Sequence, residues 1–324
     1  MIKLQEKTII IKGKKFFIRV EDSDQASDYQ KYENLRQAIW QFEEDHLAGC
    51  RNLLCENFLH EGSSLFIGAF EENEAGTFIF DEAHLVGFSY GFVGIRDKSQ
   101  GFDCPDNLWF YSQFLGVRAD RLHYGLGILI KEFQKEILLN YFHVKQVVCT
   151  YDPLTAVNAY RNLHRLGMEV LEYRIAPYGE YGGRLNRADV PCDRFFAVWY
   201  LEKAPKVRQT EEYSGDYLSL PRALRVRYQK VTGRTGPLEI EVVEEVNTDL
   251  QADQLLVQIP ADFYLLLNET DVPDEEVRKI PINWRLSTRQ VFLMYFQRGY
   301  QVVDFLKVSG KKPECFYLLK KESS

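Results

Sequence analysis

The sequence lacks several features that would place it in a common class of proteins. No apolar run reaches 18 residues, so we expect no membrane-spanning helix. The six cysteines are scattered, without a CxxC pair or a zinc-type cysteine–histidine spacing, and the six histidines do not cluster. We therefore expect reduced thiols and no metal. The first residues, MIKLQEKTIIIKGKKFF, are too charged for a signal peptide, which predicts a soluble, cytoplasmic protein with no membrane partner.

An excess of positive charge is also lacking. The chain has 40 Lys and Arg against 47 Asp and Glu, a net charge of −7. Surfaces that bind nucleic acid through its phosphates are usually basic, so this balance argues against a nucleic-acid partner. What the chain does contain is core-forming material, with 45% hydrophobic and 14% aromatic residues. Its 324 residues are a usual length for two domains.

The most informative stretch is an apolar strand followed by a glycine turn and a helix. The strand is 108–117, and Gly125-Leu126-Gly127 opens the helix. Such a turn exposes backbone N–H groups and the positive end of the helix dipole, so the pattern predicts a pyrophosphate site. Nearby basic residues either assist an anion or are ordinary solvated charges: Arg118, Arg121 and Lys131.

The helix after the turn has one apolar stripe. The residues at helical spacing are Leu126, Ile130, Phe133 and Ile137. We expect the outside to be covered by charged residues, namely Lys131, Glu132, Lys135 and Glu136.

A second strand–helix–strand unit follows. Residues 144–150 predict a buried strand, and 154–166 predict a helix that ends at Gly167. Asp152, Pro153 and Thr155 suit the start of that helix, where capping is favoured over catalysis. Further strands are expected at 170–175 and 195–201.

The rest of the chain predicts a smaller lobe. We expect an irregular linker over 205–235 and an α+β lobe over 236–324, after a first domain of 1–204. The segment 289–305 can be laid over 158–173, which indicates either a duplicated half or two ordinary helix-to-strand turns. Trp284, Arg285 and Arg289 either help this lobe to cover an acceptor cleft or provide helix packing and surface charge.

The chain resembles the GNAT (Gcn5-related N-acetyltransferase) superfamily, whose elements follow the order strand, glycine turn, helix, strand, helix, Leu-Gly and strand. Leu115-Gly116-Val117 matches the strand end, with Gly125 and Gly127 at the two glycine positions. In more detail, the chain resembles a little-characterised prokaryotic branch of predicted acetyltransferases with a C-terminal extension. The stretches that carry this resemblance are TYDPLTAVNAYRNLHRLG, Leu185-Asn186, PCDRFFAVWYL and WRLSTRQVF…GYQVVDF. The resemblance implies an α+β fold with a central mixed, mostly antiparallel sheet flanked by helices. It also implies a C-terminal lobe resembling half a GNAT domain.

The resemblance further implies acetyl-CoA, or coenzyme A, as co-substrate and an unidentified amine that attacks the thioester directly. The implied contacts to coenzyme A are Leu115, Val117, Leu122, Tyr124, Gly125, Leu126, Gly127, Ile128 and Asn158. The backbone N–H groups of Leu115 and Val117 are candidates to polarise the thioester carbonyl. Two positions depart from the family pattern, because Leu122 stands where Arg or Gln is usual and Leu163 stands where many relatives have a tyrosine acid.

Three residues are candidates for proton transfer. Tyr111 lies four residues before Leu115, which predicts the same strand face, and it is either a base or a cleft-wall aromatic. Tyr160 and His164 share a helix face and are either an acid and its partner or solvent-facing polar residues. Asn158 and Asn162 share the other flank of that helix.

Candidate contacts to the acceptor amine lie in a loop and at the start of a strand. Tyr178, Tyr181 and Arg184 are candidate acceptor contacts in the flexible, aromatic loop. Asp193-Arg194 is either a structural ion pair or an acceptor contact, and structure is favoured.

The sequence leaves three hypotheses about function open. The first is an acyl-CoA-dependent N-acyltransferase. The second is a catalytically weak or inactive acyl-CoA-binding or regulatory protein that retains the fold, and the third is a purely structural two-lobed protein. Exposed strand edges also predict that the chain can form a homodimer.

Overall fold

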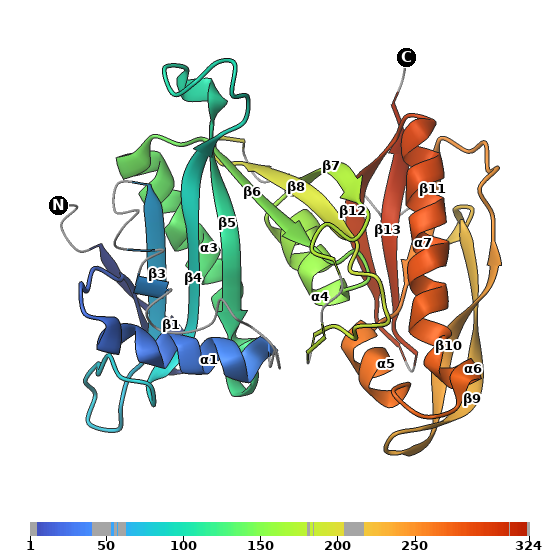
Figure 1. The fold of residues 1–324 in the computed structure, drawn as a ribbon, viewed down its shortest axis with the longest axis horizontal. Helices are drawn as coiled ribbons and strands as arrows, with labels where there is room; N and C mark the ends of the chain where they lie inside the picture. Colours follow the sequence, from blue (N-terminus) through green and yellow to red (C-terminus); the bar gives the residue numbers. More distant parts are fainter. Residues whose placement is uncertain are drawn as a thin grey trace. The chain divides into compact units, whose positions relative to one another are not determined.

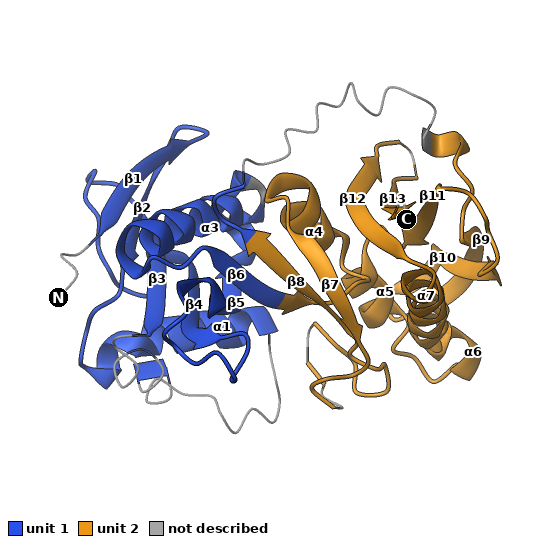
Figure 2. Cartoon of the chain, turned by 90° about the horizontal axis from the view of Figure 1, so that it is seen from above, with its two compact units in different colours: residues 1–149, 200–203 blue, residues 150–199, 204–324 orange. Residues whose placement is uncertain are grey.

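The structure is a computed structural model, which describes residues 5–40, 53–54, 57, 63–179, 182–183, 185–203, 217–310 and 312–322. The chain forms two compact units: unit 1 comprises residues 1–149 and 200–203, and unit 2 comprises 150–199 and 204–324 (Figure 2). The predicted division at 204 and 236 follows composition rather than compactness, and it stays a prediction.

Unit 1 is built on a mostly antiparallel sheet. In sheet order its strands are β1 (Glu6–Ile11), β2 (Lys14–Val20), β3 (Ser64–Glu71), β4 (Leu85–Ile95), β5 (Leu108–Val117) and β6 (Gln146–Tyr151), whose last two residues belong to unit 2. Neighbours are antiparallel as far as β5, and β6 runs parallel to β5. Helices α1 (Gln30–Trp40) and α3 (Leu126–Ile137) cover opposite faces (Figures 1 and 2).

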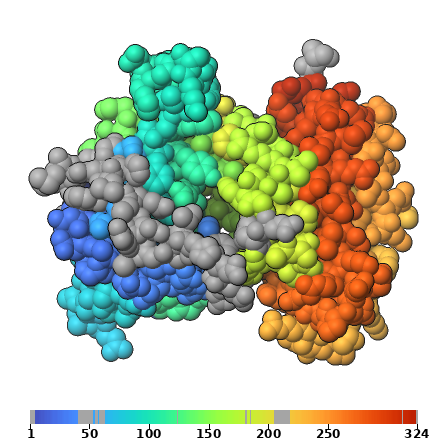
Figure 3. Space-filling model, viewed as in Figure 1, coloured from blue at the N-terminus to red at the C-terminus, as the bar shows by residue number. Residues whose placement is uncertain are grey.

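Aromatic packing holds α1 against this sheet. Phe66 stacks on Phe88 and Tyr90, and Tyr32 of α1 meets Phe66 edge-on at 4.8 Å between ring centroids. On the other face, the four residues of the predicted α3 stripe are all buried, which confirms that prediction. The polar loop 96–107 projects from the end of β4 and β5 (Figures 1 and 3).

Strand β5 contains an irregularity that matters for the site. Its pairing with β4 shifts between Tyr90–Phe114 and Gly91–Ser112, so β5 carries one extra residue, Gln113. Its pairing with β6 is confined to Phe110–Val147 and Tyr111–Val148. From Ser112 onward, this edge of β5 is not paired with β6.

Unit 2 contains the second helix of the sequence pattern. After β6, α4 (Ala156–Ala159) continues as a π-helical stretch (Tyr160–Arg165), and β7 (Glu169–Arg174) pairs antiparallel with β8 (Arg194–Tyr200). Gly167 ends the helix with φ +68°, as predicted, and Gly299 ends α7 in the same way with φ +80°.

The remainder of unit 2 has two small sheets and three helices. Strands β11 (Gln254–Ile259), β13 (Glu314–Lys321) and β12 (Tyr300–Val308) form one sheet in that order, and β9 (Leu224–Gly233) pairs with β10 (Gly236–Val246). The helices are α5 (Phe263–Glu269), α6 (Glu275–Arg278) and α7 (Ile280–Gln297). Rings of Phe195, Phe292 and Tyr317 meet in its core.

The architecture confirms the predicted α+β fold class, with one local correction. β9 occupies 224–233, inside the stretch predicted as an irregular linker, because its alternating basic and apolar residues form a half-exposed strand rather than a loop. No helix in the described part of the chain is long and apolar enough to cross a membrane.

Candidate coenzyme A site and the polar network of unit 2

The glycine turn forms as the sequence predicts. A 3-10 turn (Ala119–Tyr124) leads into Gly125, which adopts the left-handed conformation (φ +74°, ψ 11°) at the N-cap of α3. The N–H groups of Ile128 and Leu129 close the first turn onto the Gly125 carbonyl, at 3.0 and 3.3 Å. The N–H groups of Leu126 and Gly127 precede these bonds, so they are available to an anion at the positive end of the helix.

Cations surround the residue before the turn. The Tyr124 ring centroid lies 5.4 Å from Lys12 Nζ, 6.0 Å from Lys14 Nζ and 5.9 Å from the Arg121 guanidinium. Arg121 also pairs with Glu71 at 2.6 Å. Partial burial opposes ionisation of Glu71, but hydrogen bonds from Arg121 and Lys14 outweigh it and lower the pKa of Glu71 below its usual value.

The predicted coenzyme A contacts differ in exposure. Leu122 is 57% exposed, with no polar group to offer, and the Leu126 side chain is fully buried, so only its backbone could reach a ligand. The partly buried members are Leu115, Val117, Tyr124, Gly127 and Ile128. These roles stay predictions.

Lys131 corrects one expectation. The sequence predicts it on the outside of α3, but it is 3% exposed and donates hydrogen bonds to Ser112 Oγ (2.9 Å) and Gln134 Oε1 (2.6 Å). Its position in the helix lies beside the apolar stripe, and its long stem carries the ammonium inward to β5. Of the three basic residues near the turn, Arg118 and Arg121 remain there and pair with Asp120.

The predicted face of Tyr111 is also wrong. Ser112 bonds to α3, whereas Phe114 lies against Trp40 of α1, with 5.0 Å between ring centroids. The extra residue Gln113 therefore shifts the alternation of side chains, and Tyr111 and Leu115 point to opposite faces. Whether Tyr111 acts as a base stays a prediction.

Tyr160 and His164 share a face, as predicted, and that face meets β12 within unit 2. Their rings stack at 4.8 Å between centroids, and His164 Nδ1 lies 3.3 Å from Oδ1 of the buried Asp304. Lys307 Nζ lies 4.8 Å from the Tyr160 ring centroid. Asn158 is half-buried and donates to Thr155 Oγ1 at 3.0 Å.

The predicted acceptor contacts are only partly described. Tyr178 is 51% exposed, with its hydroxyl 2.5 Å from Thr150 Oγ1 and its ring 5.6 Å from the Arg194 guanidinium. Tyr181 and Arg184 lie outside the described residues.

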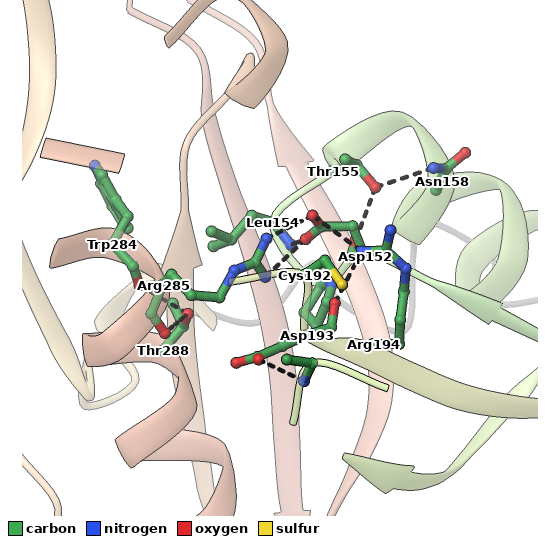
Figure 4. Close-up of polar contacts among 12 residues, drawn as sticks. Asp152, Leu154, Thr155, Asn158, Cys192, Asp193, Arg194, Trp284, Arg285 and Thr288 are labelled. Atoms are coloured by element: carbon green, nitrogen blue, oxygen red, sulfur yellow. Dashed lines mark hydrogen bonds and ion pairs between the residues drawn. The ribbon is translucent and has the colours of Figure 1, made fainter. Parts of the chain in front are cut away.

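Sequence reasoning missed the most deeply buried ion pair among the described residues of unit 2. Arg285, 0% exposed, donates from both terminal nitrogens to Asp152, 8% exposed, at 2.8 and 2.5 Å (Figure 4). Asp152 also accepts from the Leu154 N–H at 2.8 Å in the turn before α4, but the N-cap of α4 is Thr155 and no side chain caps it, so the predicted capping role is wrong. Burial alone would raise the pKa of Asp152, but attraction to Arg285 and Arg194 lowers it. The surface-charge alternative is therefore wrong for Arg285, because this helix face is the core of unit 2.

Arg289, one turn of α7 after Arg285, binds a second carboxylate in the same way. Asp193 receives two hydrogen bonds from Arg289, both 2.8 Å, one from the Tyr173 hydroxyl at 2.6 Å and one from the Ala176 N–H at 3.0 Å. This supports the structural interpretation of Asp193. The signal in the sequence was an arginine, Arg285, within the apolar spacing of α7.

No family model matches the chain, and no curated protein matches it either. Solved structures to which it is similar include the acetyltransferase of GNAT family from Streptococcus pneumoniae (11% identity, TM-score 0.41), which covers 57% of this chain and 99% of its own. Another is the ribosomal-protein-S18-alanine N-acetyltransferase from Escherichia coli (13%, 0.41), covering 59% and 97%. A third is Arabidopsis thaliana NAA60 in complex with acetyl-CoA (14%, 0.41), covering 58% and 99%.

Proposed function

We propose that the chain binds acyl-CoA at the Gly125 turn and transfers the acyl group to an amine. The observation that carries this proposal is the arrangement around β5. One end of the strand leads into a glycine turn with available N–H groups, and the edge between that end and Ser112 is not paired with β6. A pyrophosphate at the turn and an extended amide-containing arm along the free edge would use both features.

The chemistry required of the residues is limited. The thioester carbonyl must accept a hydrogen bond from a backbone N–H on the edge of β5 that is not paired with β6. The attacking amine must lose a proton, and the leaving thiolate must be stabilised. Acetyl-CoA is the proposed donor, and the amine is left open.

A catalytically weak acyl-CoA-binding protein is the second candidate. Leu122 offers no polar side chain at the turn, and Leu163, in place of the usual tyrosine, is buried. Within unit 2, His164 and Tyr160 contact Asp304 and Lys307 of β12.

A thermal-shift titration with acetyl-CoA, longer acyl-CoAs and free coenzyme A tests binding. A ligand that binds only the native state stabilises it by RT ln(1 + [L]/Kd), about 2.7 kcal/mol at one hundred times Kd, so the melting temperature should rise steadily with ligand concentration. No shift with any of these ligands would remove both candidates. If a shift is seen, release of free thiol from acetyl-CoA with a panel of amines separates the enzyme from the weak binder.

A further inference from the structure

A buried polar cluster lies between β5 and α3 in unit 1. Lys131 Nζ donates to Ser112 Oγ and to Gln134 Oε1, and all three residues are buried. Ser89 of β4 belongs to the same face. It is paired with Leu115 and lies two residues from Gly87, where a Cβ would meet Ile130 of α3 at 3.3 Å.

Two atoms of this cluster have no partner among the described residues. They are Ser89 Oγ and Gln134 Nε2, both in fully buried side chains. Leaving a buried polar group unsatisfied costs about 1–3 kcal/mol, and an apolar residue of similar shape would avoid the cost. The ammonium, the hydroxyls and the amide N–H can all donate, so the cluster suits an anion or a carbonyl oxygen.

The cluster also lies along the edge of β5 on which the proposed arm would run. Ser112 is the first β5 residue beyond the pairs with β6, and Val117, five residues later, ends the strand that leads toward the glycine turn. At about 3.3 Å per residue, Ser112 and Val117 are roughly 17 Å apart. An arm that extends along this edge from a pyrophosphate at Gly125 would carry the sulfur of coenzyme A toward Ser112. This step rests on the proposed function.

We propose that Ser112, hydrogen-bonded to the buried ammonium of Lys131, stabilises the thiolate that leaves during acyl transfer. The acceptor nitrogen bonds to the carbonyl carbon, the carbon–sulfur bond breaks, and its electron pair goes to sulfur. Ser112 Oγ accepts from Lys131, so its own hydrogen is directed elsewhere and is donated as a hydrogen bond to the sulfur. The proton released by the amine finally neutralises the thiolate through solvent. Lys131 acts through Ser112 and is a positioning residue.

This arrangement would compensate for Leu163. The family pattern has a tyrosine acid in place of Leu163, whereas here a hydroxyl polarised by a buried cation would keep the thiolate a good leaving group. A charge in a poorly solvated site acts more strongly than the same charge in water.

The test is a pH titration of the thiol of bound coenzyme A, followed by the ultraviolet absorbance of the thiolate. The ordinary pKa of a cysteine thiol is about 8.5, and free coenzyme A titrated under the same conditions supplies the reference value for its own thiol. We expect the pKa of the coenzyme A thiol to be lowered in the complex by about one to three units, the effect of a nearby opposite charge. S112A and K131M should return it toward the ordinary value. S112T, which keeps the hydroxyl, and K135M, which removes a neighbouring charge of α3, should leave it lowered.

Binding is measured separately, by the melting-temperature shift with coenzyme A. If coenzyme A binds but its thiol titrates at the ordinary pKa, or equally in wild type and S112A, the inference is overturned while the proposed function stands. If the wild type does not bind coenzyme A, the proposed function fails and the inference with it. S112A removes no buried charge, so it decides the matter even if K131M does not fold.

Discussion

The most deeply buried cation among the described residues of each unit has different surroundings. Arg285 in unit 2 lies against the carboxylate of Asp152, and Asp193 lies against Arg289 in the same way. Lys131 in unit 1 donates to an alcohol and an amide, and Ser89 Oγ and Gln134 Nε2 on the same side of the sheet have no partner among the described residues. Arg285 Nε is also without a described partner, but its bidentate carboxylate contact is typical of a structural pair in a core, whereas a cluster of buried donors is typical of a site that binds a ligand.

The largest effect should come from breaking the structural pair. Arg285→Met leaves Asp152 buried without its main partner, and we expect the free energy of unfolding to fall by about 3–5 kcal/mol. Urea denaturation measures this. The control is Arg225→Met, at a 66% exposed side chain paired with Glu244 and Glu245, which should change stability by less than about 1 kcal/mol.

A double variant sharpens the interpretation. Asp152→Asn keeps the side-chain oxygen that accepts from the Leu154 N–H but removes the charge, so Arg285→Met combined with Asp152→Asn should recover part of the loss. If the double variant is no more stable than the single one, the uncompensated charge is not the cause.

The same pair predicts a pH dependence. The folded-state pKa of Asp152 is lowered below the unfolded value of about 3.9, so its stabilising contribution is present above that pH and is lost as the pH falls through the folded pKa. The stability difference between wild type and Arg285→Met should therefore be largest near neutral pH and should narrow in acid. Denaturation curves at a series of pH values would contradict this if the difference stayed constant to about pH 3.

A smaller effect distinguishes two glycines with similar conformations. Gly125 and Gly299 have φ of +74° and +80°, and a Cβ at either position would meet nothing within 4 Å. Alanine at each should cost about 1 kcal/mol of stability through backbone strain alone. Only Gly125→Ala should also weaken coenzyme A binding, measured by calorimetry. Equal binding by both variants would place the ligand away from the turn.

The smallest effect is a gain in affinity. Leu122→Arg adds a phosphate partner at an exposed position beside the turn, and we expect coenzyme A to bind about three- to tenfold more tightly, roughly 1 kcal/mol. Leu218→Arg adds the same charge at an exposed position of unit 2 and should have no effect. A gain with both variants would indicate only general attraction.

The sequence was most informative where local chemistry decides the structure. The α3 stripe, the Gly125 turn and the helix end at Gly167 each depend on neighbours within one or two turns, and each formed as predicted. Features that depend on residues distant in the sequence could not be predicted in this way. The extra residue in β5 depends on pairing with β4, and the burial of Lys131 depends on a serine 19 residues away.

The site was predictable to a lesser degree than the fold. The glycine turn has a local signature, but the partners of Arg285 are set by tertiary packing, and the sequence shows only an arginine in an apolar pattern. Likewise, the helical spacing of Tyr160 and His164 predicted their shared face but not that β12 would cover it.

The separation of Asp152 and Arg285 along the chain, 133 residues, has a consequence for synthesis. A ribosome makes Asp152 long before Arg285. The Tyr317 hydroxyl, which donates a hydrogen bond to the Pro153 carbonyl, is made 164 residues after Pro153. The Asp152 carboxylate and the Pro153 carbonyl therefore lack these two partners until α7 and nearly the last strand have been made. Unit 1 needs only residues up to 149 and four more, so a stalled or truncated chain would present one nearly finished unit and one that cannot close.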